Sequence, residues 1–145
     1  MANSRAKFLG HPLHPALTHF PMALLSVSLL WDIIGSITRN TLWWHISFWS
    51  LVVGLIFVLP VLTTGLIDSA TIAKDGPAEK VMTIHMYVML CAALLYLGDL
   101  LLRLKNVVPS NLGLALALSA VGFLTLVVGG WYGGELVYKH GAGRA

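Results

Sequence analysis

The first long apolar run of the chain opens on the stretch HPLHPALTHFP, residues 11–21, which holds three histidines and three prolines. Proline is tolerated at the start of a helix, because the first backbone N–H groups have no acceptor within the helix. The residues that follow carry no carboxylate, lysine or arginine until Asp32. The stretch therefore predicts the beginning of a long apolar helix with histidines at its start.

Composition extends this prediction to the whole chain. Of 145 residues, 57% are hydrophobic and 10% are charged, whereas soluble domains carry about 25% charged residues. Four runs, at residues 16–37, 43–67, 81–104 and 112–134, are each long enough for a bilayer crossing, which needs ~20 residues. Because lipid cannot satisfy open backbone groups, each run is expected to be a helix.

The connections between these runs are short, which places consecutive helices antiparallel. We therefore predict an all-α fold: one domain, residues 1–145, forming an integral membrane up-down four-helix bundle. No internal repeat is apparent in the sequence. Asp32 lies inside the first run and no cleavage motif precedes it, so we expect this helix to be retained rather than removed as a signal peptide. The single cysteine, Cys91, cannot form an internal disulfide.

Four crossings put both termini on one side, here called side A. Its basic residues outnumber those of the opposite side B by six (Arg5, Lys7, Lys74, Lys80, Lys139, Arg144) to three (Arg39, Arg103, Lys105). The positive-inside rule then predicts cytoplasmic termini. Basic residues scattered at the ends of apolar runs are typical of membrane flanks, so the net charge of +3 does not indicate nucleic-acid binding.

Five of the six histidines map to side A, namely His11, His14, His19, His85 and His140, and only His45 maps to side B. Asp68 and Glu135 join them at side A. His19 and His85 lie about 6 and 12 Å along their predicted helices, at 1.5 Å per residue. Ionisable groups at such depths are candidates for a function.

A b-type haem needs two imidazoles from facing helices and small residues beside the ring. We take His19 and His85 as the best axial candidates, His140 as the alternative partner and His14 as a further ligand candidate. Such a haem would pass electrons to a quinone or a partner protein. A zinc or copper site is an alternative, with Asp68 or Glu135 as a ligand or as support for one. In a third reading the histidines only form structural hydrogen bonds, without a cofactor. No strong enzyme motif is present.

Two other features concern packing. Gly129 and Gly133 lie four residues apart, a spacing that lets another helix approach closely, within the chain or in a homo-oligomer. Asp99 and Arg103, also four apart, are expected to form an ion pair. Asp32 either reaches water on side B or pairs with a basic residue of another helix.

The chain resembles the domain-of-unknown-function family 2231 of predicted bacterial membrane proteins. The likeness rests on the opening histidine stretch, on GLID at residues 65–68, on His85, and on the ending GGELVYKHG at residues 133–141. Residues matching the family pattern are His14, His19, Asp68, His85 and His140. The resemblance implies a location in the bacterial inner membrane and, through cytochrome-like partners in some members, favours electron transfer. It implies no assigned activity.

Overall fold

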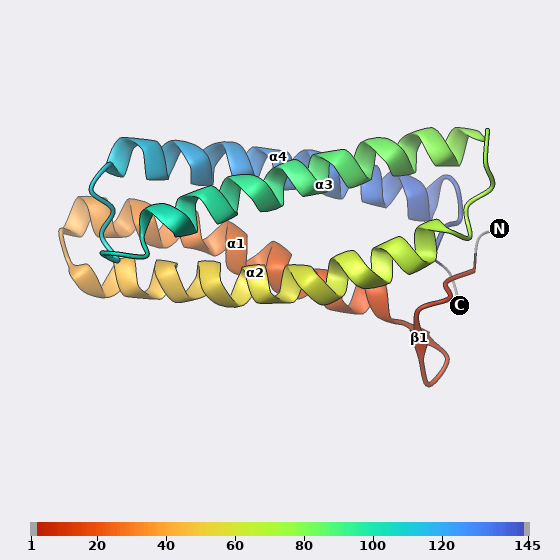
Figure 1. Ribbon diagram of the computed structural model, residues 1–145, viewed down its shortest axis with the longest axis horizontal. Coiled ribbons are helices and arrows are strands. Elements are labelled where there is room, and N and C mark those ends of the chain that lie inside the picture. Colours follow the sequence, from red (N-terminus) through yellow and green to blue (C-terminus); the bar gives the residue numbers. More distant parts are fainter. Residues whose placement is uncertain (1–2, 144–145) are drawn as a thin grey trace.

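The computed structural model describes residues 3–143 and consists mainly of helix (Figure 1). The four helices are α1 (Leu13–Thr38), α2 (Thr41–Ser69), α3 (Pro77–Leu102) and α4 (Leu112–Tyr138). A small antiparallel hairpin, formed by strands β1 (Lys7–Phe8) and β2 (His11–Pro12), precedes α1. The predicted all-α four-helix bundle is confirmed.

Each helix is long and apolar enough to cross a membrane. All four are 26 to 29 residues long, which exceeds the ~20 residues of a minimal crossing. The helices extend past most predicted limits, since polar residues in their terminal turns stay helical. Many leucines, isoleucines and valines are exposed along their outer faces, as expected for surfaces that contact lipid.

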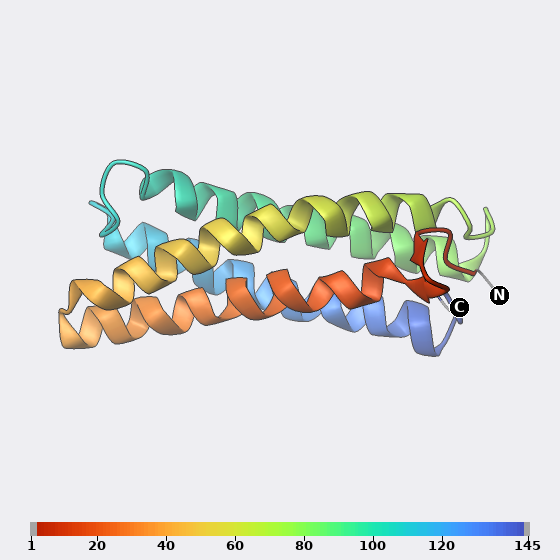
Figure 2. The ribbon, with the colours of Figure 1, turned by 90° about the horizontal axis from the view of Figure 1, so that it is seen from below.

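The bundle is built from two helical hairpins, α1–α2 and α3–α4 (Figures 1 and 2). Helices within a hairpin contact each other extensively, whereas the two hairpins contact each other far less. The first and last described segments lie at the same end of the bundle (Figure 1). That end is side A, as the sequence predicts.

The buried centre of the bundle is small. It consists of five residues drawn from all four helices: Leu25, Leu51, Ala92, Tyr96 and Leu126. Two glycines make room for the largest of them. A Cβ atom at Gly54 would lie within 3 Å of Leu25, and one at Gly122 would lie 3.0 Å from the Tyr96 ring.

The Leu25–Gly54 and Tyr96–Gly122 contacts occupy equivalent positions in the two helical hairpins. They reveal a structural repeat that is not apparent in the sequence. Tyr96 follows Leu25 by 71 positions, and Gly122 follows Gly54 by 68. The same offsets relate the histidine contacts described below. The hairpins therefore use one packing scheme twice, although few of the equivalent residues are identical.

Candidate functional site

The imidazole of His14, in the first turn of α1, is held against α2. Its Nδ1 lies 3.0 Å from the carbonyl oxygen of Val61, and its Cε1 lies 2.9 Å from where a Cβ of Gly65 would stand. A carbonyl oxygen can only accept, so Nδ1 carries the proton. The lone pair is then on Nε2, the nitrogen that neutral histidine commonly offers to a metal.

His85 repeats this arrangement in the second hairpin. Its Nδ1 donates to the carbonyl oxygen of Gly129 at 2.9 Å, and its Cε1 lies 3.1 Å from where a Cβ of Gly133 would stand. In each hairpin the acceptor carbonyl precedes the glycine by four residues, one helical turn. His85 is likewise left with its lone pair on Nε2.

The two histidines are equivalent positions, since His85 follows His14 by 71 residues and Gly133 follows Gly65 by 68. Both rings are partly buried. Thr64 adds a second neighbour to the His14 ring, with its hydroxyl 3.4 Å from Nδ1. The structure thus gives α1 and α3 one imidazole each at side A, and both rings carry their proton on Nδ1.

The other predicted ligand candidates lie differently. His19 is exposed on α1, and its Nδ1 is 3.4 Å from the Ala16 carbonyl oxygen of the same helix. Its position on the outer face, five residues beyond His14, separates it from the arrangement that holds His14 and His85. His140 lies past the end of α4, and its Nε2 is buried without a hydrogen-bond partner.

Asp68 holds the N-terminal segment in place. Its carboxylate accepts hydrogen bonds from the Ser4 hydroxyl at 2.9 and 3.0 Å, and from the backbone N–H groups of Arg5 and Ala6 at 2.7 and 3.0 Å. A carboxylate with this many donors is satisfied within the chain. The structure therefore gives Asp68 an anchoring role for the N-terminal segment.

Glu135 and the α4 glycines also make contacts within the chain. Glu135 pairs with Lys139 at 2.8 Å on the surface. Gly129 faces Met89 so closely that a Cβ would clash with its sulfur, and Gly133 faces His85. The close approach predicted for the Gly129 and Gly133 face takes place against α3 of the same chain, so this face is not free for a second copy. Within residues 3–143 no group of three or more His, Cys, Asp or Glu side chains could hold a metal ion.

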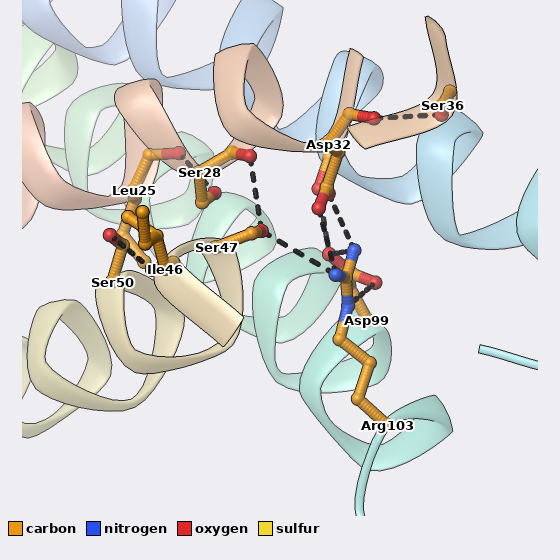
Figure 3. Close-up of polar contacts among 10 residues, drawn as sticks. Leu25, Ser28, Asp32, Ser36, Ile46, Ser47, Ser50, Asp99 and Arg103 are labelled. Atoms are coloured by element: carbon orange, nitrogen blue, oxygen red, sulfur yellow. Dashed lines mark hydrogen bonds and ion pairs between the residues drawn. The ribbon is translucent and has the colours of Figure 1, made fainter. Parts of the chain in front are cut away.

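A second polar centre lies at the opposite end, inside the bundle (Figure 3). The guanidinium of Arg103, directly after α3, binds the carboxylate of Asp32 in α1 and that of Asp99 in α3. Nη1 lies 2.8 Å from Asp32 Oδ1, and Nε lies 2.9 Å from Asp99 Oδ1. All three side chains have no exposed surface. The predicted Asp99–Arg103 pair is confirmed, and Asp32 takes the second alternative, pairing across helices.

Side chains of α2 and α4 complete this buried ion cluster. Ser119 donates to Asp99 at 2.7 Å, Ser47 lies 3.4 Å from Arg103 Nη1, and the Trp44 ring stands 5.7 Å from the guanidinium carbon. The hydrogen bonds and ion pairs with Asp32 and Asp99 compensate for the hydration that the buried guanidinium loses. All four helices thus meet at one permanently charged arginine.

Sequence reasoning missed the serines and Trp44 of this cluster, and it also missed the pairing of His14 with Gly65. One signal was available. The spacing of His14, Leu25 and Asp32 equals that of His85, Tyr96 and Arg103. Because the equivalent residues differ in type at two of these three positions, the equal spacing becomes recognisable only when the contacts between the helices are known.

The fold and these two centres define a polytopic membrane protein with a histidine pair near one end and a buried ion cluster near the other. The family model described as "Predicted membrane protein (DUF2231)" matches residues 10–145, nearly the whole chain. The chain belongs to this family, in agreement with the resemblance seen in its motifs. Searches among curated proteins and among solved structures find no match.

Proposed function

We propose that this protein is a membrane-embedded b-type haem-binding subunit for electron transfer, in which His14 and His85 would hold the haem iron. The observation that carries the proposal is the matched setting of these two rings. Each donates Nδ1–H to a carbonyl of the neighbouring helix, and each rests on a glycine. Haem iron in b-type sites takes one imidazole on each face of a flat ring.

The residues present fit such a group chemically. His14 and His85 come from different helical hairpins, and each would offer its Nε2 to the iron. Met22 and Met89 contribute apolar side chains beside the α4 glycines. His140, with a buried and unpaired Nε2 after α4, is the candidate to hydrogen-bond a carboxylate of the group. His19 falls behind His14 as an axial candidate because it is exposed.

When bound, a haem supplies one-electron chemistry at the iron. The chain itself fixes the tautomers of His14 and His85 through the carbonyl oxygens of Val61 and Gly129. A quinone or a partner protein would exchange the electron. We further propose that the protein lies in a bacterial inner membrane with side A in the cytoplasm. Arg103 is internal and paired, so Arg39 and Lys105 are the two basic residues that remain for side B. This smaller number of basic residues favours the proposed orientation.

A visible spectrum tests the proposal. Protein expressed with added haem and purified in detergent should show a sharp α band on reduction and about one iron per chain. His14→Ala and His85→Ala should each lose that band, while the control His19→Ala keeps it, since His19 lies outside the pair.

A colourless protein without iron would reject the haem assignment. Zinc or copper in the same sample, lost in the His85→Ala variant, would point to the metal alternative. Absence of haem, zinc and copper, with all three variants folded, would leave the histidines a structural role only.

A further inference from the structure

We propose that the N-terminal hairpin, residues 7–12, anchors the protein to the headgroup region of an anionic bilayer by inserting Phe8 and Leu9. Phe8 ends β1 and Leu9 begins the turn, and the two residues are 65% and 83% exposed. Large apolar side chains that exposed, on a short protruding turn, favour the boundary between headgroups and acyl chains over water.

The backbone at the tip supports a role for Leu9. The turn between β1 and β2 has Leu9 at φ 48° and Gly10 at φ 83°, and two consecutive positive φ angles are the pattern of a two-residue hairpin turn that favours Asn or Gly at its first position. A leucine at positive φ is uncommon and costs conformational energy. This strained position therefore presents a large apolar side chain where a small polar residue would suit the backbone better.

The rest of the N-terminal segment fixes where the tip points. Asp68 binds the Ser4 hydroxyl and the backbone of Arg5 and Ala6, and the Ala6 carbonyl accepts from Leu13 N–H at 2.8 Å. His11 donates from Nδ1 to the Leu9 carbonyl at 3.0 Å and so supports the turn. The hairpin is thus tied to both α1 and α2 and is held as a defined element.

The position of the hairpin and the charges beside it favour lipid as the partner of its tip. The hairpin projects sideways from the bundle, level with the last turns of α2, whereas the α2–α3 loop extends farther along the long axis (Figure 1). A sideways projection at the end of a membrane-spanning bundle lies along the bilayer surface. Arg5 and Lys7 are exposed beside the tip, and the nearby carboxylate of Asp68 is already hydrogen-bonded, which suits anionic headgroups.

The hairpin also supplies an apolar contact with the membrane boundary at side A, beside α1 and α2. On the second half, Trp131 and Tyr138 of α4 are 76% and 85% exposed and form the aromatic belt typical of a membrane boundary. Phe8 and Leu9 provide the corresponding contact beside α1 and α2. Each helical hairpin is then anchored at the same boundary.

Depth-dependent quenching tests this assignment in the full chain. In a Cys91→Ser background, which removes the single cysteine, Leu9→Cys is labelled with an environment-sensitive fluorophore and reconstituted into phosphatidylcholine vesicles containing phosphatidylglycerol. The control is Lys74→Cys in the α2–α3 loop, exposed at the same end of the molecule. Circular dichroism checks that both variants keep the helical content of the parent.

The label at position 9 should emit at shorter wavelength, be quenched by lipids with a shallow spin label, and resist iodide. The label at position 74 should show the reverse. Adding Arg5→Gln and Lys7→Gln should reduce lipid quenching at position 9, and so should omitting phosphatidylglycerol.

Equal iodide quenching at positions 9 and 74 would overturn the proposal, because the tip would then lie in water. So would a position 9 label shielded from iodide yet unaffected by spin-labelled lipid, which would indicate a protein partner or a second copy. Neither result depends on haem, so this inference and the proposed function fail separately.

Discussion

Arg103 shows how one residue can hold several helices together in a membrane. It binds Asp32 and Asp99, and the three side chains have no exposed surface. Removing water from three charges is costly, and attraction compensates for it only where the geometry is good and the remaining polar atoms are paired. Ser119 adds such a hydrogen bond. The cluster joins the two helical hairpins where apolar contact between them is sparse.

Substitution of Arg103 should therefore be severe. Arg103→Met leaves two buried carboxylates without their counter-charge, and we expect a loss of about 3–5 kcal/mol in unfolding free energy. Titration of the detergent-solubilised protein with SDS, followed by circular dichroism, measures it. Lys105→Met, an exposed neighbour of the same charge type, serves as the control and should change stability by less than about 0.5 kcal/mol. A similar small loss for Arg103→Met would contradict a structural role for the cluster.

At the scale of helices, the two hairpins solve one packing problem in the same way. A side chain on the first helix of each hairpin lies on a glycine of the second, as His14 does on Gly65 and His85 on Gly133. A glycine at these positions lets the imidazole approach the backbone of the next helix closely enough to reach its carbonyl. The glycines are thus part of the histidine site, although they carry no functional group.

A methyl group at these glycines should disturb the histidine site more than the fold. In Gly133→Ala the new Cβ meets His85 Cε1 at 3.1 Å, so the ring must shift and its bond to Gly129 weakens. We expect haem affinity to fall about tenfold or more, the usual scale for lost support of a ligand. Haem titration of the apoprotein measures the affinity, and circular dichroism checks helical content.

Gly134→Ala is the matched control for this substitution. Its Cβ would lie 3.9 Å from the nearest atom, a carbon of Tyr138, which is ordinary contact. Equal haem affinity in the two variants would show that the His85 ring does not depend on the space above Gly133.

The whole molecule has distinct ends. The N-terminal hairpin lies at side A (Figure 1), as do the helix ends that carry His14, Asp68 and His85, whereas Arg103 follows the opposite end of α3. Because Arg103 is neutralised inside the bundle, the positive surface charge is concentrated at side A. The positive-inside rule counts residues in loops and flanks, so a buried arginine does not oppose it.

Reporter fusions test this orientation. Green fluorescent protein at the C-terminus should fluoresce and alkaline phosphatase there should be inactive, as expected for a cytoplasmic end. Fusion after Asn40, in the turn between α1 and α2, should give the reverse. Active phosphatase at the C-terminus would contradict the proposed topology, and side A would then face the other compartment.

The amino-acid sequence alone determines the class and the course of the chain. Four apolar runs with short connections force helices that alternate in direction, because lipid leaves no other way to satisfy the backbone. The same pattern correctly predicts that both termini share an end and that Asp99 pairs with Arg103. These conclusions depend on local composition and on spacing within one helix.

Only the tertiary structure decides which side chains meet. Sequence could place His14, His19 and His85 near one end, but the rotation of each helix about its axis decides that His14 faces α2 while His19 faces outward. In a lipid environment an apolar residue suits both the inner and the outer face, so hydrophobic periodicity does not report that rotation. Close contacts at Gly65 and Gly133, and the pairing of Asp32 with Arg103, fix it instead, and these are contacts between residues far apart in the chain.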